Sequence, residues 1–122
     1  MEKTINLGVI GIDHGHIFDM LDEMLKEGCT CDYFWTDGEP LTLKEFNSKY
    51  PNIKRKENKK EILNDPSIDM ILISSVPKDR AHNSIEALKA GKDVMVDKPG
   101  CTTLDQLNQL KQTVKETGKI WS

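Results

Sequence analysis

Short runs of apolar residues alternate along the chain with segments whose apolar residues recur at helical spacing. The runs predict strands at residues 5–10, 31–36, 53–56 and 69–75 and one ending at Asp97, and the periodic segments predict helices near 17–27, 41–50, 58–63, 79–90 and 103–117. Residues 119–122 look like the start of another strand. This alternation is typical of a parallel sheet wrapped by helices. We therefore expect an α/β, Rossmann-like, doubly wound fold: a mainly parallel sheet of five to six strands with helices on both faces, in three layers.

Capping residues refine three of these helices. Asn58 with Glu61 and Thr103 with Gln106 have the spacing of a capping box, and Asp79 is placed to cap the helix that follows Pro77. The last helix is expected to bury one leucine-rich stripe, made of Leu104, Leu107, Leu110 and Val114.

Length and charge limit the classes of protein. A chain of 122 residues suits one domain, residues 1–122, and a net charge of −3 argues against nucleic acid or an anionic membrane as a partner. The single basic run, Lys54, Arg55, Lys56, Lys59 and Lys60, is interleaved with Glu57 and Glu61 and indicates a solvated face. No run approaches the ~18 apolar residues of a membrane span and no signal peptide is evident, so a cytoplasmic location is expected.

Three cysteines in such a chain indicate reduced thiols. Cys29 and Cys31 would share one face of a strand, but the ligands that would complete a zinc site do not follow at finger-like spacing. Packing is the expected role of both thiols.

The first strand-to-helix turn carries candidate cofactor chemistry. A dinucleotide site needs glycines there, so that the backbone can turn tightly and approach the pyrophosphate. Gly11 can make the turn, but Asp13 and His16 then occupy the second and third glycine positions, with Gly15 out of register. Asp13 would bring a carboxylate toward the pyrophosphate unless it turns away or caps the helix.

Asp37 follows the second strand directly, where an acid can hold the adenosine ribose hydroxyls. A carboxylate there favours NAD over NADP, because it repels the 2′-phosphate, and no arginine directly follows it. The alternative interpretation is a turn aspartate in the pair Asp37-Gly38.

A metal site made of Asp13, His14 and His16 is a further hypothesis, because a carboxylate and two imidazoles occur within four residues. Gly15 and the helical stripe that begins at Ile17 argue against it, since a turning chain is not expected to bring positions two apart together. Polar contacts of a cofactor loop, or an ordinary histidine at a helix start, are the alternatives.

The strand before Pro99 brings Asp97 and Lys98 to its carboxyl end, where open α/β sheets keep their chemistry. Pro99 has a fixed φ and no amide hydrogen, so it ends the strand and stiffens the backbone that carries the lysine. Lys98 is then either a catalyst or a surface charge.

Together these motifs resemble the Gfo/Idh/MocA oxidoreductases. The order is a glycine turn after the first strand, an acid after the second, Ser-Ser-Val-Pro at 74–77, Glu-Ala-Leu-Lys-Ala-Gly-Lys at 86–92, and Asp97-Lys98-Pro99 in place of the family's Glu-Lys-Pro. The resemblance implies NAD or NADP as cofactor and hydride transfer with a secondary alcohol of a sugar or small polyol. The family's usual histidine falls at Arg80, so no role is carried to His82.

The resemblance also implies roles for particular residues. Lys98 would be catalytic, with Asp97 keeping the role of the family's glutamate. The residues expected to contact the cofactor are Gly11, Ile12, Asp13, His14, Asp37, Ser74, Ser75, Val76, Pro77, Lys98 and Pro99. The family's second, mostly β domain forms the substrate pocket and a dimer interface, so a homo-oligomer is possible and the 122 residues alone should not turn over substrate.

Two other functions remain open at this point. One is a Rossmann module that has lost its cofactor and serves as a binding or regulatory partner, which the irregular glycine loop favours. The other is a metal-dependent hydrolase that uses Asp13, His14 and His16.

Overall fold

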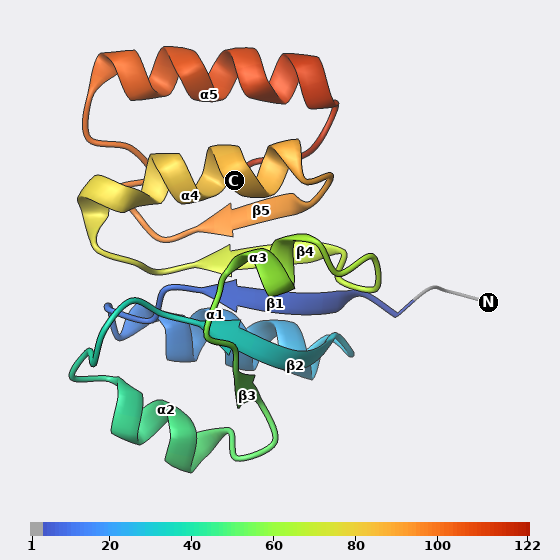
Figure 1. The fold of residues 1–122 in the computed structure, drawn as a ribbon, viewed down its shortest axis with the longest axis vertical. Helices are drawn as coiled ribbons and strands as arrows, with labels where there is room; N and C mark the ends of the chain where they lie inside the picture. Colours follow the sequence, from blue (N-terminus) through green and yellow to red (C-terminus); the bar gives the residue numbers. More distant parts are fainter. Residues whose placement is uncertain (1–3) are drawn as a thin grey trace.

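The computed structural model describes residues 4–122, which form alternating strands and helices (Figure 1). The strands are β1 (Asn6–Ile10), β2 (Thr30–Trp35), β3 (Lys54–Arg55), β4 (Met70–Ile73) and β5 (Asp93–Val96). The helices are α1 (His16–Lys26), α2 (Leu43–Lys49), α3 (Lys60–Leu63), α4 (Pro77–Lys89) and α5 (Leu104–Thr117). Among the described residues, no helix is long and apolar enough to cross a membrane.

The five strands form one parallel sheet in the order β3-β2-β1-β4-β5. The strand order reverses between β1 and β4, so the carboxyl ends of these two strands flank the crevice where open α/β sheets bind ligands. Beyond β5, Trp121 forms a parallel bridge with Val94, which agrees with the expected start of a further strand.

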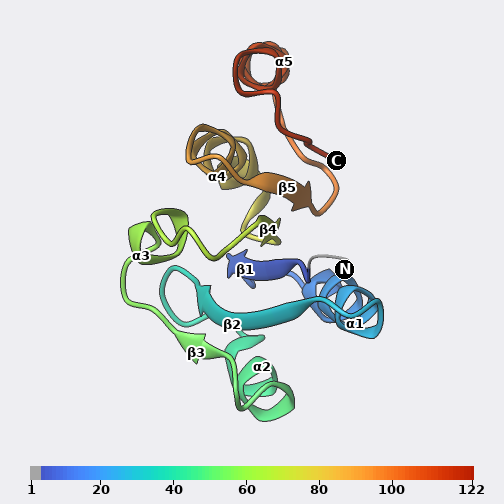
Figure 2. The same cartoon turned by 90° about the vertical axis from the view of Figure 1, so that its right-hand side faces the viewer.

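Helices cover both faces of the sheet (Figure 2). α1 and α2 lie on one face and α3 and α4 on the other, and this gives the three layers that the sequence predicts. Successive residues of β1 supply both layers: Val9 packs with α1 and α2, whereas Ile10 packs with α3 and α4. The Rossmann-like prediction is therefore confirmed. Cys29 and Cys31 are free, half-buried thiols that pack against the hydrophobic residues between the sheet and helices α1 and α2.

Three details of the helices differ from the prediction. Asn58 does not form the expected capping box, because Lys59 occupies the N-cap of α3 and the Asn58 side chain accepts from the Lys60 N–H. Asp79 does not cap α4: the helix begins at Pro77, whose fixed φ and missing N–H suit the first helical position, so Asp79 lies within the first turn. Leu104 is 73% exposed, because α5 packs mainly against one helix, α4, and buries a narrow stripe around Leu110. The expected capping box of Thr103 and Gln106 is present.

Candidate functional site

The turns that follow β1 and β4 are packed directly against each other. Gly11 has a φ of +84°, and a Cβ built on it would lie 2.4 Å from the Cβ of Ser75. The backbone N–H of Ser74 donates to the Gly11 carbonyl at 3.1 Å, and the N–H of His14 donates to the Ser74 carbonyl at 3.1 Å. Glycine is therefore required at position 11 for the two turns to approach this closely.

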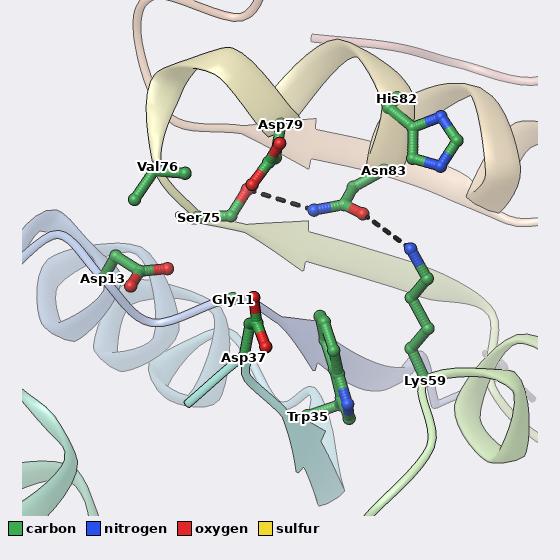
Figure 3. Close-up of a pocket in the computed structure, with 10 residues that line it drawn as sticks. All are labelled: Gly11, Asp13, Trp35, Asp37, Lys59, Ser75, Val76, Asp79, His82 and Asn83. Atoms are coloured by element: carbon green, nitrogen blue, oxygen red, sulfur yellow. Dashed lines mark hydrogen bonds between the residues drawn. The ribbon is translucent and has the colours of Figure 1, made fainter. Parts of the chain in front are cut away.

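A pocket opens beside these packed turns, at the carboxyl ends of β1, β2 and β4 (Figure 3). Five of the residues expected to bind the cofactor line it: Gly11, Asp13, Asp37, Ser75 and Val76. Its other walls come from Trp35 and from residues of the β3–α3 connection and α4. The structure thus brings together the glycine turn, the acid after the second strand and part of the 74–77 turn.

Lys59 lines this pocket. The charge pattern of the sequence predicts a solvated face for Lys59, and the structure differs from that prediction. The Lys59 ammonium lies 2.5 Å from a Glu86 carboxylate oxygen, donates to the Asn83 side chain at 3.2 Å, and stands 5.5 Å from the centre of the Trp35 ring. Asn83 in turn donates to the Ser75 hydroxyl at 3.1 Å (Figure 3). These bonds link the far wall of the pocket to the turn after β4.

Asp37 is exposed and lies at the pocket mouth, with its turn held by a neighbouring strand. The Arg55 guanidinium of β3 donates to the carbonyls of Thr36 and Gly38, at 3.1 and 2.6 Å. It also pairs with Glu39 at 3.3 Å. Asp37 is therefore both a turn residue and a carboxylate presented to the pocket.

Asp13 also faces the pocket and does not cap a helix, because the residue at the N-cap of α1 is Gly15. Burial raises the pKa of the Asp13 carboxyl above its ordinary value, although hydrogen bonds from the N–H groups of Asp13 and Val76 oppose this effect. The nearby charges of Asp37 and Asp79 raise the pKa further. The pocket floor is therefore acidic.

The backbone of the glycine turn is largely engaged within the chain. The N–H of Gly11 donates to the Trp35 carbonyl at 2.7 Å, and that of Ile12 donates to the Thr36 hydroxyl at 3.3 Å. The Ile12 carbonyl accepts from the Thr42 hydroxyl. The side chain of Ile12 is fully buried in the core, so Ile12 shapes the turn without facing the pocket.

A second group of polar side chains lies on the other side of the 74–77 turn. His14 Nδ1 is 3.5 Å from one carboxylate oxygen of Asp97, and His16 Nδ1 is 2.9 Å from the other. The two imidazole rings have centroids 4.2 Å apart. The expectation that the turn keeps these histidines apart is therefore wrong: His14 precedes α1 and His16 begins it, so the bend at Gly15 folds both rings toward β5. The acid that joins them is Asp97, and Asp13 lies in the pocket that contains Asp37.

Asp97 is 6% exposed and is held by three partners besides His14. The Ser74 hydroxyl donates to it at 3.1 Å, Arg80 Nη2 approaches it at 3.4 Å, and His16 shares the hydrogen bond described above. Burial alone would raise the pKa of Asp97, but the bonds with His16 and Ser74 and the charge of Arg80 outweigh it and lower the pKa below its ordinary value.

Lys98 and Pro99 are exposed at the end of β5, and Pro77 is exposed at the start of α4. Lys98 lines a shallow groove with His16 and Asp97, and among residues 4–122 no ion pair is recorded for its ammonium. The lysine is thus accessible on the side of the sheet edge that carries the two histidines.

Three residues that build the site have no role predicted from the sequence: Arg80, Lys59 and Asn83. Arg80 is 1% exposed, and its position beside Ala81 on the inner face of α4 is the signal that could have marked it as a buried cation. Lys59 and Asn83 offer no comparable signal, because they meet only when α3 and α4 pack on the same face.

Several features of this pocket bear on what it could bind. Gly11 leaves room that any side chain would remove, and the Asp37 carboxylate and Trp35 line the same pocket. The acidic Asp13 and the engaged N–H groups are unfavourable for a bound pyrophosphate, compared with a regular glycine loop.

Residues 5–122 match the model of the Gfo/Idh/MocA oxidoreductases, described as an oxidoreductase family with an NAD-binding Rossmann fold. The fold and the glycine-turn pocket define a dinucleotide-binding domain, and the chain belongs to this family. The resemblance stated from the sequence is confirmed.

The matched relatives extend well beyond this chain. It is 36% identical to the uncharacterized oxidoreductase YdgJ of Escherichia coli and 25% identical to the NADP(+)-dependent scyllo-inositol 2-dehydrogenase IolW of Bacillus subtilis. These matches cover 100% and 98% of this chain but 34% and 32% of the relatives. A crystal structure described as an oxidoreductase from Erwinia carotovora atroseptica superposes with a TM-score of 0.93 at 32% identity, covering 98% of this chain and 35% of the other.

Proposed function

We propose that this chain is the cofactor-binding part of a dehydrogenase that transfers hydride between NAD and a secondary alcohol of a sugar or cyclitol. The observation that carries the proposal is the Asp37 carboxylate in a pocket with Gly11 and Ser75, at the reversal of strand order. The scyllo-inositol dehydrogenase among the relatives supports a cyclitol or sugar as substrate. Because the chain spans about a third of these relatives, the substrate pocket is expected to need further residues.

Within this function, residues on one side of the 74–77 turn bind the cofactor and residues on the other side contact the substrate. Asp37 accepts hydrogen bonds from the adenosine ribose, and Ser75 and Val76 line the path toward the nicotinamide, which supplies the hydride acceptor when bound. Lys98 donates a hydrogen bond to the substrate oxygen, and its charge favours the negative charge that develops there. Asp97 positions the turn that carries Lys98.

Calorimetric titration with NAD⁺ and NADP⁺ tests the proposal. Wild type is expected to bind NAD⁺ more tightly than NADP⁺, and Asp37→Ala is expected to lose NAD⁺ affinity on the order of tenfold, the effect of one hydrogen bond to a charged group. Asp32→Ala is the matched control, because Asp32 is an exposed acid of β2, the strand that precedes Asp37, and lies outside the pocket. An Asp37→Ala affinity equal to wild type would remove the ribose role.

The alternative is a Rossmann module that has lost its cofactor. The acidic Asp13 on the pocket floor and the engaged N–H groups of Gly11 and Ile12 favour it, since both weaken a pyrophosphate site. Wild type that binds neither dinucleotide in the same titration would support this alternative and contradict the dehydrogenase proposal.

A further inference from the structure

The cluster of His14, His16 and Asp97 has the composition of a metal site. Two imidazole nitrogens and one carboxylate oxygen lie within 4.8 Å of one another, and they come from the turn before α1, the first residue of α1 and the end of β5. Imidazole and carboxylate together suit zinc and similar divalent transition metals.

The spacing of the ligand atoms agrees with this interpretation. Two ligand atoms at ordinary zinc distances and a tetrahedral angle are about 3.4 Å apart. His14 Nδ1 lies 3.5 Å from Asp97 Oδ2, and His16 Nδ1 lies 2.9 Å from Asp97 Oδ1. Both separations are near the expected one, so small side-chain rotations would admit an ion. The backbone N–H of His16 now donates to His14 Nδ1 at 3.2 Å, a contact that a metal would replace.

The surroundings of Asp97 supply the outer hydrogen bonds that metal ligands have. Ser74 donates to the carboxylate at 3.1 Å, and the fully buried Arg80 holds both its side chain and its backbone carbonyl. Such partners fix the direction of a ligating oxygen. The anchored ligand is thus buried, while the side chains of His14 and His16 are 52% and 61% exposed.

We propose that His14, His16 and Asp97 bind one divalent transition-metal ion of the zinc type. Three protein ligands leave at least one coordination position open, as in zinc sites that hold water or an oxygen ligand. Two of the three ligands, His16 and Asp97, line the same groove as Lys98. The site is separate from the pocket that contains Asp37, so the inference does not depend on dinucleotide binding.

Metal titration of the tag-free chain, stripped with a chelator that is then removed, tests the inference without cofactor or substrate. Calorimetry with Zn²⁺ is expected to show one ion per chain with a micromolar or lower Kd. His14→Ala and His16→Ala are each expected to weaken binding at least tenfold, the minimum loss seen even for outer-shell partners. Both histidines are exposed, so the variants should keep the wild-type circular dichroism spectrum.

His82→Ala is the matched control: His82 is also exposed, lies on α4 and pairs with Glu86 at 3.1 Å, so its loss should leave the Kd unchanged. Co²⁺ gives a second measurement, in which a visible d–d band without a thiolate charge-transfer band would identify a nitrogen and oxygen site and exclude the three thiols, Cys29, Cys31 and Cys101. A millimolar Kd, or His14→Ala and His16→Ala variants that bind as tightly as wild type, would overturn the inference and leave a hydrogen-bonded cluster only.

Discussion

Arg80 is a buried cation whose guanidinium contacts two different turns. It donates to the Ser75 carbonyl at 2.7 Å in the turn after β4, and to the carbonyls of Asp97 and Pro99 at 3.3 Å each in the turn after β5. It also lies 3.4 Å from the Asp97 carboxylate. One side chain therefore fixes the relation between the pocket that contains Asp37 and the residues that flank Lys98.

Arg80→Met is expected to lower the free energy of unfolding by about 3–5 kcal/mol, because it removes the donor of the buried Ser75 and Asp97 carbonyls and the cation beside the buried Asp97 carboxylate. Urea unfolding at neutral pH measures the change. Lys54→Met provides the control, since Lys54 is exposed and removal of its charge should cost less than about 1 kcal/mol. An Arg80→Met loss as small as that of the control would contradict the structural role of Arg80.

At the scale of residues, the sequence predicts the position of a site residue when that residue directly follows a predicted strand. Asp37 and Lys98 lie where the strand pattern predicts, because the carboxyl end of a strand is readable from its apolar run. Lys59 could not be placed in this way: its neighbours in sequence are charged and solvated, and its partners Asn83 and Glu86 belong to a helix about 25 residues later.

At the scale of elements, the contact between the turns after β1 and β4 depends on a missing side chain. A Cβ at Gly11 would lie 2.4 Å from the Ser75 Cβ and 2.8 Å from its backbone nitrogen, and the φ of +84° disfavours any other residue. Gly15, four residues on, has a φ of −63° and nothing within 4 Å of such a Cβ. The two glycines of this turn are therefore not equivalent.

Gly11→Ala is expected to destabilise the fold by about 3 kcal/mol or more, from backbone strain together with the steric clash. Gly15→Ala should change stability by less than about 1 kcal/mol, in the stabilising direction, because the residue is already helical. Thermal unfolding of both variants measures the difference. Equal midpoints for the two variants would show that the turns can separate at little cost.

The helices were predictable to the extent that local chemistry determines them. The capping box of Thr103 and Gln106 formed as expected, since it needs only residues three apart. Leu104 is exposed, against the prediction, because its burial depends on the width of the surface that α5 meets. Periodicity reports which residues share a helix face, and it does not report how much of that face a neighbour covers.

At the scale of the whole molecule, the alternation of strands and helices was sufficient to predict the parallel three-layer fold. It was not sufficient for the histidine cluster, since Asp97 lies 81 residues from His16 and meets it only because β4 and β5 add to the sheet on that side of β1. Local helix geometry therefore gave the wrong answer for His14 and His16. The order of the strands along the chain can be predicted from the sequence. Their order in the sheet, which brings Asp97 to His14 and His16, cannot.

Residues 120–122 lie at the edge of the same sheet, and their contribution to its stability is testable. Residues 120–122 pair with β5: Val94 N–H donates to the Ile120 carbonyl, and Val96 N–H to that of Ser122, both at 2.8 Å. Trp121 packs against the core on the α3–α4 face. The segment therefore covers an edge strand that would otherwise present unpaired backbone groups.

Removal of residues 119–122 is expected to lower the free energy of unfolding by about 2–4 kcal/mol, from lost aromatic burial and edge hydrogen bonds. It should also increase self-association, because the exposed edge of β5 can pair with another chain. Urea unfolding and sedimentation velocity measure the two effects. Ile120→Ala is the control: that side chain is 64% exposed and its backbone bonds remain, so a change within about 0.5 kcal/mol is expected. A shortened chain as stable and monomeric as Ile120→Ala would mean that β5 is a sufficient edge by itself.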